Sequence, residues 1–169
     1  VIYGDTDSTF VKLDDDLNSL NCNEIGTKLA EKINKRWQQV LQKDYKIDSF
    51  LEIEYETHYS PFFMPTIRGK TMGSKKRYVG KVEKNGASKL VFKGMETVRS
   101  DWTELAHEFQ TELFEILFAE NYSQELIFQT FDRYVKKLYA GEFDAKLIYR
   151  KRLGQHLTDY QKNIPPHVK

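Results

Sequence analysis

The segment Tyr3-Gly4-Asp5-Thr6-Asp7-Ser8 constrains the fold of this chain more than any other. The residues on either side, Val1-Ile2-Tyr3 and Thr9-Phe10-Val11, are β-branched or aromatic, which is typical of strands. The pattern predicts a β-hairpin whose turn carries two aspartates one residue apart. Carboxylate oxygens are the ligands that Mg²⁺ prefers, and two-metal phosphoryl or nucleotidyl transfer depends on such ligands. An ordinary polar turn is the alternative, because Asp and Gly are common in turns.

A second block, Lys75-Lys76-Arg77-Tyr78, lies downstream, and the two blocks together resemble motifs of the family B DNA polymerases. The first block is similar at all six positions to the family's Tyr-Gly-Asp-Thr-Asp-Ser motif, and the second resembles its Lys-Lys-x-Tyr motif. Residues 92–102 resemble the family's entry into the thumb, and residues 149–153, 160 and 165–168 resemble its thumb tip. The resemblance covers essentially the whole chain, and residues 51–58 and 64–69 are most similar to bacterial members.

The resemblance implies catalytic and metal-binding roles for the two aspartates of the first block. In the family, the residue matching Asp7 binds the catalytic Mg²⁺ ions directly, and the residue matching Asp5 lies beside them. The remaining metal-binding aspartate comes from an earlier strand that this chain does not contain. We therefore expect an incomplete two-ion Mg²⁺ site and no catalysis by the chain alone, because a partial ligand set does not hold the ions in reacting geometry. The exposed face of a strand is the simpler role for the nearby Glu52, Glu54 and Glu56.

The resemblance also assigns DNA contacts to the second block. By similarity, Lys76 reads the minor-groove edge of the primer-terminal base pair and Tyr78 supports the primer backbone. Lys75 and Arg77 are assigned to DNA with them. Minor-groove acceptors are shared by all correct pairs, so a lysine there senses pairing geometry without sensing sequence. The alternative is a solvated basic patch with no ligand.

Four further basic residues are candidates for phosphate contacts on the product duplex. They are Arg99, Arg150, Lys151 and Arg152. The alternative for each is a cation that suits the dipole at a helix end. The implied partners are primer–template DNA, a deoxynucleoside triphosphate in the intact enzyme and a sliding clamp reached through other parts of the protein, with no membrane.

Charge along the chain is uneven, although the formal net charge is only +1. Between Arg68 and Lys93 there are nine basic residues and a single acid, Glu83, which is the pattern expected of a surface that binds a polyanion. The lone Cys22 cannot form an internal disulfide, the four histidines lack zinc spacing, and no apolar run approaches a membrane span. We expect the reducing cytoplasm of a bacterium, in association with the nucleoid.

Periodicity predicts an α+β chain of two parts, and 169 residues suffice for one domain or two small ones. Residues 1–93 are expected to form part of a polymerase palm, with an antiparallel sheet and a covering helix that starts at a capping box at Asn21. Further strands are expected at 51–56, 62–64 and 78–82. Residues 94–169 are expected to form a mostly helical thumb, with helices capped by Asp101 and Ser123 and a stop at Gly141.

Three functions remain open at this point. The first is a DNA-directed DNA polymerase fragment, inactive in isolation, and its start without Met inside an apolar strand favours an excised C-terminal piece. The second is a non-catalytic DNA-binding module whose acidic turn is vestigial. The third is a glycosyltransferase that uses its Asp-x-Asp with manganese and a nucleotide sugar, which leaves the basic region from Arg68 to Lys93 unexplained.

Overall fold

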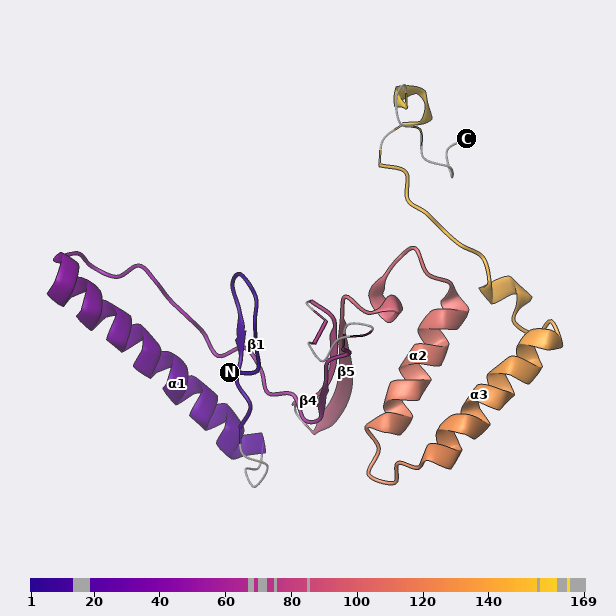
Figure 1. Ribbon diagram of the computed structural model, residues 1–169, viewed down its shortest axis with the longest axis horizontal. Helices are drawn as coiled ribbons and strands as arrows, with labels where there is room; N and C mark the ends of the chain where they lie inside the picture. Colours follow the sequence, from indigo (N-terminus) through magenta and orange to yellow (C-terminus); the bar gives the residue numbers. More distant parts are fainter. Residues whose placement is uncertain are drawn as a thin grey trace. The chain divides into compact units, whose positions relative to one another are not determined.

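The computed structural model describes residues 1–13, 19–66, 69, 73–74, 76–84, 86–154, 156–160 and 164 (Figure 1). The chain divides into two compact units, residues 1–60 with 82–89 and residues 61–81 with 90–169. Helices and small antiparallel sheets make up both, as the predicted mixed class requires.

A short hairpin opens the first unit, as predicted. Strand β1 (Tyr3–Gly4) pairs antiparallel with β2 (Thr9–Phe10), and Tyr3 lies opposite Phe10. The Asp5 N–H donates to the Ser8 carbonyl oxygen at 2.8 Å and closes the loop between the strands. The rings of Tyr3 and Phe10 are in contact, with centroids 5.4 Å apart. The acidic pair therefore lies in a loop that both strand pairing and ring contact fix at its base.

Helix α1 (Ser19–Val40) is the long helix of this unit and continues into a π-helical turn, Leu41–Tyr45. It begins two residues before the predicted cap, so Asn21 lies inside the helix and the predicted start is wrong. Six residues from Asp14 to Asn21 are of types that cap helices well, and the pattern alone does not single out one of them. Lys46, with a left-handed φ of +59°, ends the helical stretch.

The segment after α1 returns along the helix and is held by one side chain. Asn34 donates from Nδ2 to the Ile53 carbonyl oxygen and accepts from the Ile53 N–H at Oδ1, both at 2.9 Å. Gly26 lies against the ring of Tyr55, which occupies the space that a Cβ on residue 26 would need. Burial alternates as predicted, with Ile53 and Tyr55 half-buried and the glutamates between them exposed. Residues 51–59 nevertheless pair with no strand in the described part of the chain, because the Asn34 amide takes the backbone groups of Ile53.

A second sheet has the order β3-β4-β5. Its strands are β3 (Phe62–Phe63), β4 (Tyr78–Lys84) and β5 (Ala87–Lys93), and β3 pairs antiparallel with β4 so that Phe62 lies opposite Gly80. Strands β3 and β4 were predicted, whereas β5 was not. The sequence Asn85-Gly86 before it is a strong hairpin signal, and Gly86 has the positive φ, +76°, that such turns need.

The rest of the second unit is helical. A 3₁₀ turn, Glu96–Val98, precedes α2 (Glu104–Leu117) and α3 (Gln124–Tyr139), and further 3₁₀ turns follow at Asp144–Lys146 and Leu157–Asp159. The cap of α2 is Thr103, whose hydroxyl accepts from the Ala106 N–H at 3.2 Å, so the predicted cap at Asp101 is wrong. The predicted cap of α3 is confirmed, since Ser123 Oγ accepts from the Leu126 N–H at 3.1 Å.

The core of this unit lies between the sheet and α2. Val79, Met95 and Phe114 are buried there, and Val79 has no exposed surface. Phe114 contacts the rings of Phe63, Phe92 and Phe118, with centroids 5.3 to 5.7 Å apart. On another side of α2, Phe109 packs edge-on against Tyr134 of α3 at 4.9 Å. Helix α2 thus packs through two apolar sides.

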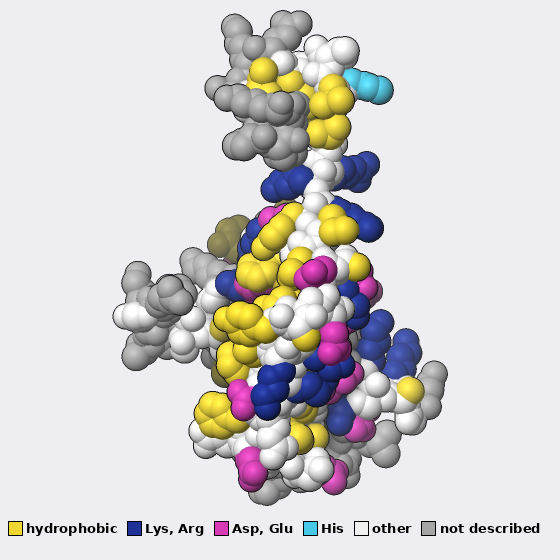
Figure 2. Space-filling view, turned by 90° about the vertical axis from the view of Figure 1, so that its right-hand side faces the viewer, with side chains coloured by type: hydrophobic (Ala, Val, Ile, Leu, Met, Phe, Trp, Pro, Cys, Tyr) yellow, Lys and Arg dark blue, Asp and Glu magenta, His cyan; other side chains and the backbone are white. Residues whose placement is uncertain are grey.

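Helix α3 has an outward side that remains in solvent. Figure 2 looks onto this part of the molecule and shows yellow apolar side chains interspersed with charged ones. Phe128, Phe131 and Tyr139 are exposed, whereas Thr130 is buried and Tyr134 is half-buried. The Tyr134 hydroxyl donates to Glu112 Oε2 at 2.9 Å. Burial and, to a smaller extent, the Glu112 carboxylate raise the pKa of Tyr134 to about 12. Phe131 is half-exposed, and its ring still packs edge-on against Phe109 of α2, with centroids 6.5 Å apart.

Candidate functional site

The acidic loop presents its two carboxylates differently. Asp5 is half-buried, and its Oδ1 accepts the Thr6 N–H at 2.8 Å. Asp7 is exposed, and no hydrogen bond or ion pair joins it to another residue in the described ranges. The loop therefore orients Asp5 through its own backbone and leaves the oxygens of Asp7 available to an outside cation.

These oxygens have the chemistry of Mg²⁺ ligands, because Mg²⁺ binds through one or two carboxylates and keeps its other positions for water and substrate phosphates. Within the residues that the structure describes, no group of three Asp, Glu, His or Cys side chains could hold a metal ion. Asp5 and Asp7 could thus supply two of the oxygen ligands that a magnesium site needs.

The basic block lies in the second unit, where its members have unequal surroundings. Lys75 falls outside the described residues. Lys76 is exposed and has a left-handed backbone, with φ +59°. Tyr78 is buried at the start of β4, with its ring 5.4 Å from that of Phe62. Arg77 lies between them with its side chain 40% exposed.

Gly94, which follows β5, lies directly against the backbone of Lys76. A Cβ on Gly94 would be 3.1 Å from the Lys76 carbonyl carbon and would overlap its oxygen. The same Cβ would lie 3.3 Å from Cγ of Arg77. Gly94 itself has φ +60°, a conformation that glycine adopts at no steric cost. Both the close approach and the backbone conformation therefore require glycine here.

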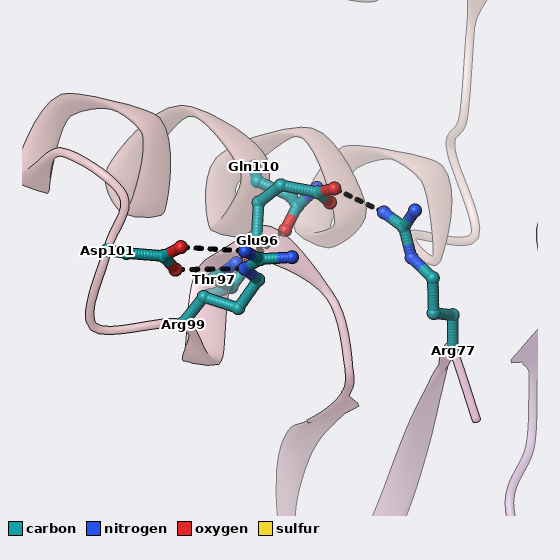
Figure 3. A network of polar contacts seen from close by, with 6 residues as sticks. All are labelled: Arg77, Glu96, Thr97, Arg99, Asp101 and Gln110. Atoms are coloured by element: carbon teal, nitrogen blue, oxygen red, sulfur yellow. Dashed lines mark hydrogen bonds and ion pairs between the residues drawn. The ribbon is translucent and has the colours of Figure 1, made fainter. Parts of the chain in front are cut away.

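Arg77 belongs to a polar network that also includes Glu96, Thr97 and Gln110 (Figure 3). Its Nη2 donates to Glu96 Oε1, and Gln110 Nε2 donates to the other carboxylate oxygen at 3.0 Å. Gln110 Oε1 accepts from the Thr97 N–H at 2.8 Å and from its hydroxyl. Burial raises the pKa of Glu96, but hydrogen bonds from Gln110, its own backbone and Arg77 outweigh it and lower the pKa.

Arg99 is bound in a bidentate pair. Its Nε and Nη2 donate to the two carboxylate oxygens of Asp101 at 2.9 and 2.7 Å (Figure 3). The Arg99 carbonyl oxygen lies 2.9 Å from His107 Nε2 of α2. The hydrogen bonds from Arg99 hold the pKa of the Asp101 carboxyl at about 2.

Lys151 of the predicted phosphate-binding run lies 3.9 Å from Asp101 Oδ2, so the structure brings Arg99 and Lys151 to one carboxylate. Arg150 and Arg152 are exposed beside it. The predicted thumb tip at 165–168 lies outside the described residues. Gly94, Glu96 and Gln110 were not predicted as site residues. The strand before Gly94 was itself not predicted, and nothing in the local pattern marks Glu96 or Gln110.

Comparison with known proteins identifies the family of the chain. The model of the family described as DNA polymerase family B matches residues 1–169. The chain is 50% identical over 169 residues to DNA polymerase II of Escherichia coli (strain K12), covering 100% of this chain and 21% of that protein. The chain belongs to the family B DNA polymerases.

More distant relatives are also DNA polymerases by name. The chain is 31% identical to the DNA polymerase delta catalytic subunit of Plasmodium falciparum, covering 99% of this chain and 14% of that protein. It is 29% identical to a DNA polymerase of Thermococcus kodakarensis, covering 99% of this chain and 9% of that protein. The chain thus spans about a fifth or less of these relatives. The glycosyltransferase alternative finds no support among them. In the described part of the chain, no helix has the length and apolar character to cross a membrane.

Proposed function

We propose that the chain supplies part of the nucleotidyl-transfer site and of the duplex-binding surface of a DNA-directed DNA polymerase. The observation that carries this proposal is the acidic loop in a chain of this family, where a paired hairpin leaves Asp7 exposed. The division into a palm at 1–93 and a thumb at 94–169 is part of the same proposal.

Asp7 and Asp5 would hold Mg²⁺ together with ligands from the rest of the intact protein. When bound, the metal lowers the pKa of the primer 3′-hydroxyl and stabilises charge at the reacting phosphorus. Asp7 contributes an exposed carboxylate, and the backbone hydrogen bond from Thr6 keeps Asp5 in a fixed orientation beside it. Two ligands do not complete an octahedral site, so the chain alone should extend no primer.

The second unit would bind the primer–template duplex, with a deoxynucleoside triphosphate bound by the intact enzyme. Lys76 is exposed and suits the minor groove, and Tyr78, whose ring packs against Phe62, would support the primer backbone. By the resemblance, Lys75, Arg77, Arg99, Arg150, Lys151 and Arg152 would also be assigned to DNA. A cytoplasmic, nucleoid-associated location follows from this activity, and a sliding clamp would bind through other parts of the protein.

The test uses the full-length protein with Asp7→Asn, which keeps the side-chain volume and removes the charge. We expect primer extension to be abolished while primer–template affinity stays within about threefold, because Asp7 binds metal rather than DNA. The control is Asp48→Asn, which removes an exposed carboxylate elsewhere in the first unit. Full extension by Asp7→Asn would reject the catalytic assignment, and normal DNA binding would then favour the non-catalytic DNA-binding module.

The duplex surface has a separate test in anisotropy titrations of labelled primer–template at two salt concentrations. Lys76→Ala should weaken binding and reduce its salt dependence, whereas Lys43→Ala on the π-helical turn should change neither. Equal affinities for the two variants would reject the assignment of Lys76 to DNA.

A further inference from the structure

The backbone of Lys76 adopts a conformation that its residue type disfavours. A non-glycine residue in the left-handed region costs about 1 to 2 kcal/mol, and such residues persist where their surroundings fix them. Lys76 is also exposed, so burial of its own side chain does not explain the conformation. The residues packed against the turn are therefore candidates for holding it.

Among the described residues, two contacts reach the turn from the three residues that follow β5. Gly94 lies against the Lys76 carbonyl group, and Glu96 accepts the Arg77 guanidinium. Lys76 is thus held by a backbone contact with Gly94, and Arg77 by an ion pair with Glu96. The Glu96 side chain is only 19% exposed, which shields this pair from solvent more than a surface pair.

Helix α2 sets the direction of the Glu96 carboxylate. Gln110 donates to Oε2 of Glu96, which leaves Oε1 for Arg77, and its own carbonyl oxygen is fixed by Thr97. Arg77 Nε is buried and has no hydrogen-bond partner in the described part of the chain. The position of Arg77 therefore depends on Glu96, and its charge is already met by a carboxylate before any phosphate approaches.

We infer that Glu96 and Gln110 are positioning residues that act through Arg77 to hold the left-handed turn at Lys76 in its DNA-binding orientation. Arg77 thereby belongs to the support of the turn, and Lys76 is the contact. This inference rests on the proposed function of Lys76. It makes an unusual prediction, because removing a negative charge near DNA should weaken DNA binding.

The experiment is a double-mutant cycle in the full-length protein, with primer–template dissociation constants measured by anisotropy at one salt concentration. The variants are Glu96→Gln, Lys76→Ala and the two together, with Glu83→Gln as the control for loss of an exposed acid on β4. Glu96→Gln should weaken binding about fivefold, whereas in the Lys76→Ala background it should change binding by less than about twofold. Glu83→Gln should leave affinity unchanged or raise it, because it only reduces repulsion of phosphates.

The outcomes separate the inference from the function on which it rests. Unchanged or tighter binding by Glu96→Gln overturns the inference, as does an effect of equal size in both backgrounds. A Lys76→Ala variant that binds normally rejects the assignment of Lys76 instead. Melting temperatures check the fold, and if Glu96→Gln unfolds, Gln110→Met takes its place. It keeps the ion pair and loses the orientation, so it should weaken binding about two- to threefold, only when Lys76 is present.

Discussion

Gly94 lies against the carbonyl group of Lys76. Two residues with positive φ thus meet at the joint where β4 begins and β5 ends. The approach leaves no room for a Cβ on Gly94. Packing at this joint continues directly into the core, since Met95 follows Gly94 and is buried beside Val79. The basic turn is therefore tied to the most buried part of its unit.

Gly94→Ala should destabilise the chain by about 3 kcal/mol, because it adds a positive-φ cost to an overlap with backbone atoms that cannot swing away. Urea unfolding measures the loss. Gly86→Ala is the matched control, since Gly86 also has positive φ but nothing lies within 4 Å of its Cβ position. It should cost about 1 kcal/mol. Equal losses for the two variants would show that the contact with Lys76 contributes nothing.

Asn34→Ala should free the segment around Ile53 from α1 without unfolding the helix. The amide supplies both a donor and an acceptor to the Ile53 backbone at 2.9 Å, and each such bond contributes about 1 kcal/mol. Hydrogen exchange at the Ile53 amide should accelerate about tenfold or more, while exchange in the middle of α1 stays unchanged. Gln38→Ala, at an exposed position of the same helix, should leave the Ile53 amide protected as before.

The Arg99–Asp101 pair predicts a specific acid sensitivity. Folding lowers the pKa of Asp101 from its ordinary 3.8 to about 2, mainly through hydrogen bonds from Arg99. A lowered carboxyl pKa stabilises the folded state above the unfolded value, and that stabilisation is lost as the pH falls toward the folded value. The contribution should thus be complete above about pH 4 and disappear by about pH 2. Asp101→Asn should flatten the stability curve in this range, and an unchanged curve would contradict the pairing.

Thr103 should act as the cap of α2 in measurements of stability. Thr103→Ala removes the acceptor of the Ala106 N–H and should cost about 1 kcal/mol at neutral pH, measured by thermal unfolding. Thr103→Ser keeps the hydroxyl and should cost less. A loss on Thr103→Ser as large as that on Thr103→Ala would mean that the buried methyl group, and not the cap, stabilises this position.

Local patterns predicted elements whose signals lie within a few residues. The hairpin around Asp5 and Asp7, the cap at Ser123 and the glycine stop at Gly141 each depend on neighbouring side chains, and the structure contains all three. The cap at Asp101 was predicted wrongly for a physical reason. Its carboxylate binds the Arg99 guanidinium two residues earlier, and a charged bidentate partner competes well with a single backbone N–H.

Contacts between distant segments were beyond such patterns. Gln110 binds Glu96 across fourteen positions, and Asn34 binds Ile53 across nineteen. Neither pair has a periodic or compositional signature, because a single side-chain amide meets its partner only after the helix and the distant segment have packed together. The candidate DNA-binding and metal-binding residues came from motif resemblance, whereas the support behind Lys76 became visible only in three dimensions.

Oxidation of Met95 can serve as a probe of the core of the second unit. Met95 is 4% exposed and packs with Val79 and Phe114, whereas Met64 is half-buried. Peroxide reaches a thioether only when solvent does, and the sulfoxide that forms is too polar for an apolar core. The rate at which Met95 is oxidised, followed by mass spectrometry, therefore reports how often this core opens to solvent. Comparing that rate with and without bound DNA shows whether DNA reduces the opening.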